Sequence, residues 1–96
     1  MKSHPKFKFR LYVAGDAQNS VRAIANLTAI CADFAEDRYE IQIVDVLREP
    51  KLALVDGIFM TPTLVKLSPL PTRRIVGTLS ERQPVLESMG MNGDSV

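Results

Sequence analysis

The chain has 96 residues, of which 46% are hydrophobic and 24% are charged, and its formal net charge is +1. This length suits one domain over 1–96, for which we expect order over about 7–89 and flexibility at 1–5 and 90–96. The near-neutral charge gives no reason to expect nucleic acid as a partner, because nucleic-acid-binding proteins usually carry a clear basic excess.

Cysteine use and hydropathy indicate a cytoplasmic protein. Cys31 is the single cysteine, so no internal disulfide can form and folding needs no oxidising compartment. No run of residues reaches the roughly 18 apolar positions of a membrane span. Charged residues interrupt the N-terminal segment at Lys6, Lys8 and Arg10, where a signal peptide would be apolar.

The first half of the chain indicates a strand followed by a helix. Residues 7–14 start with alternating apolar and polar side chains and end as an apolar run, which predicts a strand that Gly15 breaks. Apolar side chains then recur at spacings of three and four, which places them on one helix face: Val21, Ile24, Leu27, Cys31 and Phe34. Asn19 or Ser20 is the expected N-terminal cap, and we expect Cys31 to be a packed core thiol.

Three further strands and a short helix follow. Alternation over 39–47 predicts a second strand, parallel to the first because a helix connects them. A short helix over about 50–56 is expected to end at Gly57. Residues 61–67 and 73–77 are the expected third and fourth strands, which pair as a hairpin.

The last predicted helix begins at Ser80. Ser80 and Gln83 have the spacing of a capping box. Pro84 would then occupy the fourth helical position, where its missing amide removes one early hydrogen bond. The expected apolar face of this helix consists of Val85, Leu86 and Met89.

The element order β-α-β-α-β-β-α is that of an α/β thioredoxin-like domain, with Thr61-Pro62 where that fold places its cis-proline. Redox catalysis in this fold needs a reactive cysteine at the start of the first helix, and residues 15–20 contain none. His4 is the only histidine and has no cysteine partner at ligand spacing, so we expect neither a metal nor another cofactor. We therefore expect a protein-binding module rather than an enzyme.

Four strings over residues 8–86 resemble the KaiB family. Their order and spacing, rather than any single string, carry the resemblance. They are Leu11-Tyr-Val-Ala-Gly15 with Asn19-Ser-Val-Arg-Ala23, Val44-Asp-Val-Leu47 with Pro50, Thr61-Pro-Thr-Leu64, and Arg73-Arg-Ile-Val-Gly77 with Leu79-Ser80.

The resemblance implies a regulatory function. Proteins of this family bind KaiC, a hexameric ATPase, and modulate its phosphorylation cycle, and the complex engages the protein KaiA or output histidine kinases. The family also has two folds: a ground state that forms dimers or tetramers, and a thioredoxin-like monomer that binds KaiC. The change between them refolds the C-terminal half, here about residues 48–89.

The resemblance also implies partner-binding residues. Lys66, Arg73 and Arg74 match basic positions that the family presents to an acidic KaiC surface. The other interpretation is an exposed strand face that charge keeps soluble. Arg48 and Lys51, beside the short helix, are further candidates.

The second strand is expected to lie at a sheet edge. An edge strand can accept another chain by strand addition, which is how the family engages its third partners. The residues of this expected edge are Glu40, Ile41, Gln42, Ile43 and Val44.

Several positions depart from the family pattern. Gly57 stands where a lysine is common, Leu70 interrupts a run of three prolines, and Ser88 and Gly90 replace a glycine and an aspartate. The aromatic and acidic tail of cyanobacterial members is absent. These departures leave the tetramer, the rate of switching and a true clock role open. Two other functions also stay open: a sensor or adaptor module for a histidine kinase, as in the N-terminal domain of SasA, and a thioredoxin-like redox protein.

Overall fold

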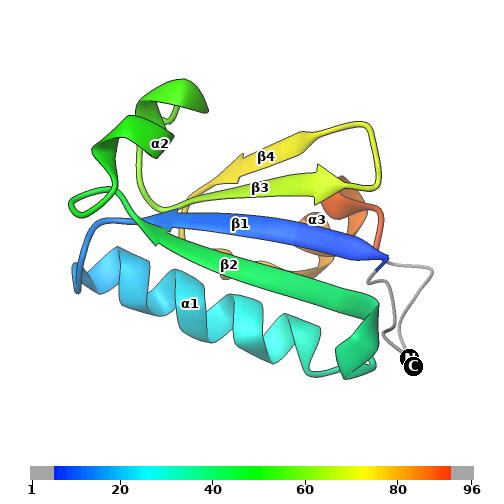
Figure 1. Cartoon of the computed structure of the whole chain (residues 1–96). Coiled ribbons are helices and arrows are strands. Elements are labelled where there is room, and N and C mark those ends of the chain that lie inside the picture. The colour runs from blue at the N-terminus through cyan, green and yellow to red at the C-terminus, as the bar shows by residue number, and fades with distance from the viewer. Residues whose placement is uncertain (1–5, 92–96) are drawn as a thin grey trace.

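The computed structural model describes residues 6–91. A four-stranded sheet in the order β2-β1-β3-β4 forms its centre. Helices α1 and α3 cover one face of this sheet, and the short helix α2 lies at one end of the other face (Figure 1). This architecture confirms the predicted thioredoxin-like fold and element order, β-α-β-α-β-β-α, with a single 3-10 turn, η1 (Glu36–Arg38), added before β2.

The central strand β1 (Phe7–Val13) carries alternating side chains to the two faces of the sheet. Phe7, Phe9, Leu11 and Val13 are buried on the side of α1 and α3. Tyr12 is fully buried on the side of α2. Because strand β1 has neighbours on both sides, it is the strand around which both cores form.

Helix α1 (Gln18–Cys31) begins before the predicted caps Asn19 and Ser20. The set of its residues that faces the core also differs from the set that the spacing predicted. Val21 is 52% exposed, whereas Ser20 is buried and its hydroxyl accepts a hydrogen bond from the Ala14 amide at 3.0 Å. Neither Asn19 nor Ser20 caps the helix, because both lie inside it and Ala17 precedes it without a side-chain bond. The buried stripe contains Ala23, Leu27, Ile30 and Cys31, so the prediction for Cys31 is confirmed.

Strand β2 (Tyr39–Asp45) runs parallel to β1, as predicted, and pairs with no other strand of the described residues 6–91. It ends two residues before the predicted boundary. The Asp45 carboxylate accepts hydrogen bonds from the amides of Gly15 at 3.0 Å and Leu47 at 2.9 Å. These two bonds turn the chain away from the sheet, towards α2.

Helix α2 (Pro50–Val55) is short, and Gly57 ends it with a positive φ of 66°. That conformation is favourable for glycine and costly for most other residues.

Strand β3 (Thr63–Ser68) then pairs antiparallel with both β1 and β4 (Arg73–Val76). The predicted cis bond at Thr61–Pro62 is confirmed, and Ser68–Pro69 and Leu70–Pro71 are also cis.

Helix α3 (Arg82–Met89) follows Glu81 as its capping position, one residue later than the predicted cap Ser80, and the predicted capping box is wrong. Glu81 precedes the helix without a side-chain cap bond. Pro84 therefore occupies the third helical position, where its missing amide costs no intrahelical bond. The predicted apolar face, Val85, Leu86 and Met89, is buried as expected.

The end of α3 extends the folded region beyond the predicted boundary at residue 89. Gly90 ends the helix in the left-handed conformation, with φ 71°. Met91 is buried, and its amide donates to the Leu86 carbonyl at 2.8 Å. These two residues therefore belong to the packed domain. The segments predicted to be flexible were 1–5 and 90–96, of which residues 1–5 and 92–96 lie outside the described residues.

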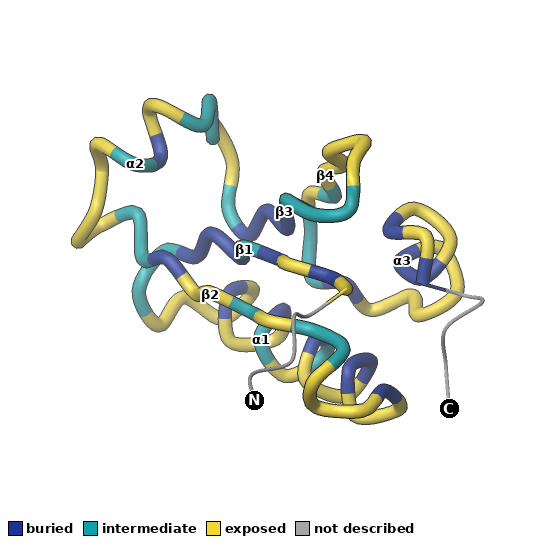
Figure 2. The backbone as a smooth tube through the Cα atoms, turned by 45° about the vertical axis from the view of Figure 1, so that its right-hand side comes forward, coloured by how far each residue is buried: buried dark blue, intermediate teal, exposed yellow. Residues whose placement is uncertain are grey.

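Two apolar cores of unequal size lie on the two faces of the sheet. In Figure 2 long stretches of β1 and β3 are coloured as buried, whereas α2 and β4 are mostly exposed or intermediate. The larger core joins β1 and β3 to α1 and α3. The smaller core consists of Tyr12, Val44, Ala53 and Val65, with α2 lying over it. The α2 face of the sheet therefore has less apolar burial than the opposite face.

Candidate protein-binding face

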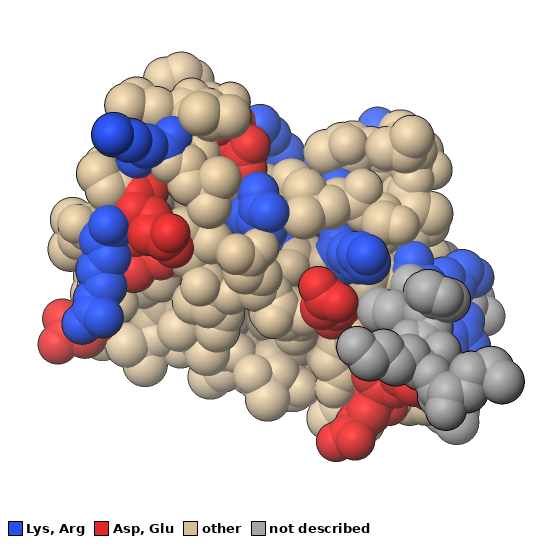
Figure 3. All heavy atoms as spheres, in the orientation of Figure 1, with Lys and Arg blue, Asp and Glu red and all other residues tan. Residues whose placement is uncertain are grey.

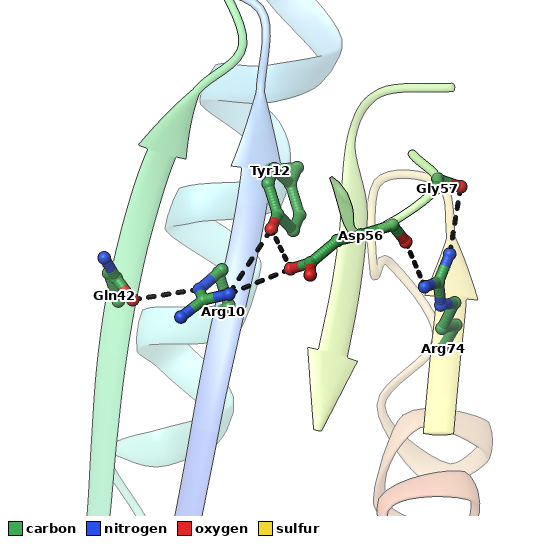
Figure 4. Close-up of polar contacts among 6 residues, drawn as sticks. All are labelled: Arg10, Tyr12, Gln42, Asp56, Gly57 and Arg74. Carbon is green, nitrogen blue, oxygen red and sulfur yellow. Dashed lines mark hydrogen bonds and ion pairs between the residues drawn. The ribbon is translucent and has the colours of Figure 1, made fainter. Parts of the chain in front are cut away.

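The C-terminal end of α2 is tied to the sheet by a polar network (Figure 4). The Asp56 carboxylate accepts hydrogen bonds from the Tyr12 hydroxyl and from Arg10 Nη1, the latter at 2.8 Å. Arg10 Nε also donates to the Gln42 side-chain oxygen at 2.9 Å. Strands β1 and β2 thus both contribute to holding Asp56.

A second arginine holds the same turn from the far strand. Arg74 on β4 donates from Nη2 to the Asp56 carbonyl and from Nη1 to the Gly57 carbonyl at 3.1 Å. These carbonyls follow the last turn of α2, where no intrahelical amide reaches them. Arg74 therefore satisfies the backbone of the turn while Arg10 and Tyr12 satisfy its carboxylate.

The network shifts the pKa values of its members in consistent directions. The hydrogen bond from Tyr12, and then that from Arg10, lower the pKa of Asp56. Burial raises the pKa of Tyr12, and its bond to Asp56 raises it further. The pKa of Arg10 is also raised, chiefly by its hydrogen bond to Tyr12. Asp56 is therefore an anion and Arg10 a cation throughout the physiological range.

Large apolar side chains project into solvent around this turn. Phe59 is 91% exposed and Leu54 75%, and further exposed apolar side chains flank them. In Figure 3 the atoms at the top of the molecule, over α2, are mostly uncharged, and both basic and acidic atoms lie beside them. We call this surface the α2 face and define it by Leu47, Leu54, Val55, Phe59 and Met60.

Two hollows lie on either side of this surface. One is lined by Phe59 and Met60 together with Arg74 and Val76 of β4. The other is lined by the start of α2, including Arg48, Lys51 and Val55. The α2 face is therefore an uneven apolar surface with basic side chains on both flanks, which is a shape suited to a protein partner.

The predicted basic residues of β3 and β4 do not form one patch. Lys66 opposes Phe9 and Arg73 in the sheet, so both basic side chains lie on the α1 and α3 side. Lys66 is buried, and burial, with a smaller contribution from the positive Arg73, lowers its pKa. Arg74 lies on the opposite face, beside α2. The interpretation of all three as one exposed strand face is therefore wrong.

The remaining predicted residues lie where sequence reasoning expected them. Arg48 and Lys51 are exposed beside and within α2. Residues 40–44 lie in β2, which is an edge strand, and Glu40, Gln42 and Ile43 are exposed. Within the described sheet, β2 thus has a free edge on the side away from β1, separate from the α2 face.

The polar network itself was not predicted from sequence. Arg10 and Asp56 are 46 positions apart, and no local pattern links them. The sequence does carry a weak indication of the α2 face. Ile58, Phe59 and Met60 form an apolar run between Gly57 and the proline at 62, within a connection where polar residues are usual.

Cys31 and the residues able to bind metals were two further candidate features of the sequence. Cys31 is buried, and burial raises the pKa of its thiol to about 11, so the thiolate that redox catalysis needs is not formed at neutral pH. Residues 6–91 contain no group of three or more histidine, cysteine, aspartate or glutamate side chains placed to hold a metal. His4 lies outside these residues. No helix among them is long and apolar enough to cross a membrane.

Solved structures similar to this chain share its fold. The N-terminal domain of SasA from Synechococcus elongatus aligns with a TM-score of 0.73 at 18% identity, covering 100% of this chain and 93% of the domain. Chloroplastic thioredoxin z also aligns with a TM-score of 0.73, at 16% identity, covering 94% of this chain and 93% of the thioredoxin. These likenesses show a thioredoxin-like fold.

Sequence comparison is more specific. The circadian clock oscillator protein KaiB of Synechococcus elongatus is 45% identical over 86 residues, covering 90% of this chain and 84% of that protein. The protein of the same name from Prochlorococcus marinus is 40% identical over 96 residues, covering 100% of this chain and 91% of the relative. The KaiB domain model matches residues 10–91, and the chain therefore belongs to the KaiB family.

Proposed function

We propose that this chain is a non-enzymatic regulatory protein that binds a KaiC-type hexameric ATPase through its α2 face and modulates the phosphorylation and ATPase cycle of that partner. The exposure of large apolar side chains around α2 carries the proposal. Contiguous apolar surface of this kind marks interaction sites in proteins. The curated relatives are named circadian clock oscillator proteins, which supports a role in a timing system.

The charge around the α2 face indicates the chemistry of the partner. At the start of α2 two basic side chains, Arg48 and Lys51, and one acidic side chain, Glu49, are exposed beside the hollow that Val55 lines, so the basic charge is in excess there. Basic side chains at the rim of an apolar interface favour an acidic partner surface and accelerate association. We therefore expect the affinity for the ATPase to fall as salt concentration rises, since salt screens exposed charges over about 8–10 Å.

Lys66 and Arg73 have a smaller role in this proposal than the family resemblance implied. Arg73 is exposed on the opposite side of the sheet from the α2 face, and the buried Lys66 has little surface to offer. Arg74 contributes by holding the turn after α2. Substitution of Arg48 or Lys51 is thus expected to weaken binding more than substitution of Arg73.

The free edge of β2 supports a second partner in the same complex. Strand addition along residues 40–44 would leave the α2 face available, because β2 and α2 present different surfaces. A KaiA-like protein or a histidine kinase is the expected class of third partner. A kinase-adaptor role without a KaiC-type ATPase, and the ground-state dimer or tetramer, stay predictions.

Size-exclusion chromatography of the chain mixed with the KaiC-type ATPase from the same organism, with nucleotide present, tests the proposal. Slow co-elution with the hexamer is expected for the wild type, and its loss is expected for a Leu54→Ser, Phe59→Ser variant. The matched control replaces Val21 and Leu70, which are also exposed apolar residues but lie on α1 and in the β3–β4 turn. Equal co-elution of both variants, or none for the wild type with an intact hexamer, would refute the proposal.

A further inference from the structure

Apolar burial alone does not explain how α2 keeps its position. Within Pro50–Val55 only Ala53 is buried, and Leu52 is partly buried against the smaller core. An isolated helix of six residues is unstable in water, because too few hydrogen bonds offset the cost of nucleation. The helix therefore depends on contacts made at its ends.

The contacts at its C-terminal end come from both sides of strand β3. Tyr12 and Arg10 on β1 hold the Asp56 carboxylate, while Arg74 on β4 holds the Asp56 and Gly57 carbonyls. Strand β3 lies between β1 and β4 in the sheet. The turn after α2 is therefore fastened at two points that straddle β3, which fixes its direction as well as its distance from the sheet (Figure 4).

The part of the network around the Asp56 carboxylate is sheltered from water, whereas Arg74 and its bonds to the two carbonyls are exposed. Tyr12 is fully buried, and the side chains of Arg10 and Asp56 are only 20% and 25% exposed. Hydrogen bonds to a charged group in such surroundings are stronger than those at an open surface. By contrast, the ion pair between Arg82 and Asp33 has side chains that are 43% and 51% exposed.

We propose that Arg10, Tyr12, Asp56 and Arg74 form an anchor, the Asp56 anchor, that positions the α2 face for its partner. These four are positioning residues. Their hydrogen bonds hold the turn after α2 against the sheet, and this keeps Leu54, Phe59 and Met60 pointing outward. Without the anchor, these apolar side chains would sample other arrangements, and binding would have to order them again. This last step rests on the proposed function, whereas the anchoring of α2 does not.

Amide hydrogen exchange on the free protein tests the anchor. In the Asp56→Asn and Tyr12→Phe variants, the amides of residues 53–58 are expected to exchange about tenfold faster or more, because each variant loses or weakens hydrogen bonds to a charged group. Amides of α1 and β1 are expected to accelerate by no more than the loss of global stability in the same variant accounts for, and an unchanged circular dichroism spectrum shows that the fold is intact. Asp33→Asn removes a carboxylate from the exposed ion pair and is the matched control, with no change expected near α2.

Binding to the KaiC-type hexamer tests the positioning role. Affinity is expected to fall by roughly the same factor as exchange accelerates, and double substitution at Tyr12 and Asp56 should cost less than the sum of the single effects, because the two groups share one hydrogen bond. Unchanged exchange in both variants would overturn the anchor. Faster exchange with wild-type affinity would overturn the positioning role. If the wild type itself failed to bind, the proposed function would fall, and the exchange rates would still decide whether the anchor exists.

Discussion

The two faces of the sheet are held in place by different forces. On the α1 and α3 side, Phe7, Phe9, Leu11 and Leu64 form a continuous buried core with both helices. On the α2 side the core is small, and a polar network supplies much of what fixes the short helix. The first face has its large apolar side chains inside, and the second leaves several of them in water.

This difference between the two faces means that the residues that stabilise the fold are largely not those available to bind a partner. Apolar area removed from water stabilises a fold by roughly 25 cal/mol per Å². A side chain that is buried in the core for this reason cannot also contact a partner protein. Holding α2 through Asp56 instead leaves Leu54 and Phe59 free to contact another protein. A substitution should therefore affect folding on one face and binding on the other.

Leu11→Ala should have the largest effect on stability. Leu11 is fully buried on the helix-covered face. Its truncation is expected to lower the free energy of unfolding by about 2–5 kcal/mol, the range for a large-to-small change in a packed core. Urea unfolding followed by circular dichroism would measure the change. A loss below about 1 kcal/mol would show that this face is not the main source of stability.

Asp56→Asn should have an intermediate effect. It removes the charge that Arg10 and Tyr12 bind, and we expect a loss of about 1–3 kcal/mol at neutral pH. The same urea experiment measures it. A loss as large as that of Leu11→Ala would mean that the polar network, rather than the apolar core, dominates the stability of the domain.

Acid should remove the contribution of Asp56 in the wild type. Because the folded-state pKa of Asp56 is lowered from its ordinary value of 3.8, its stabilising effect is complete above that value and is lost as pH falls through the folded pKa. The difference in unfolding free energy between wild type and Asp56→Asn should therefore be constant well above pH 3.8 and shrink as pH falls below that value. A difference that stays constant below that value as well would contradict the assignment of Asp56 as the bound anion.

Asp33→Asn should have the smallest effect. Its partner Arg82 and Asp33 itself are both about half exposed, so the ion pair that joins the end of α1 to α3 is screened by water and salt. We expect a change below about 0.5 kcal/mol, and less at high salt. A loss comparable to that of Asp56→Asn would show that burial does not distinguish the two ion pairs.

Sequence periodicity was enough to predict the element order, the parallel β1–β2 pair and the β3–β4 hairpin. It was less reliable for single positions. Val21 continues the three-and-four spacing of Ile24 and Leu27, yet Ser20 takes the buried position because its hydroxyl satisfies the Ala14 amide. A polar residue that is buried with a backbone partner has no signature in a hydropathy pattern.

Prediction of the site was limited by register and by distance along the chain. Lys66 and Arg74 lie on opposite faces of the β3–β4 hairpin, a fact that depends on which residues pair across the turn. The contact between Arg10 and Asp56 forms only when α2 folds over β1. In contrast, Arg48, Lys51 and the edge strand follow from local position alone, and their predicted locations match the structure.

Amide hydrogen exchange of the chain bound to the KaiC-type hexamer, compared with the free chain, tests most directly whether recognition occurs on the α2 side. Added protection is expected over residues 47–60 and at the neighbouring part of β4, with the exposed surface of α1 unchanged. Protection confined to α1 and α3, with residues 47–60 exchanging as in the free chain, would contradict the assignment of the α2 face as the binding surface.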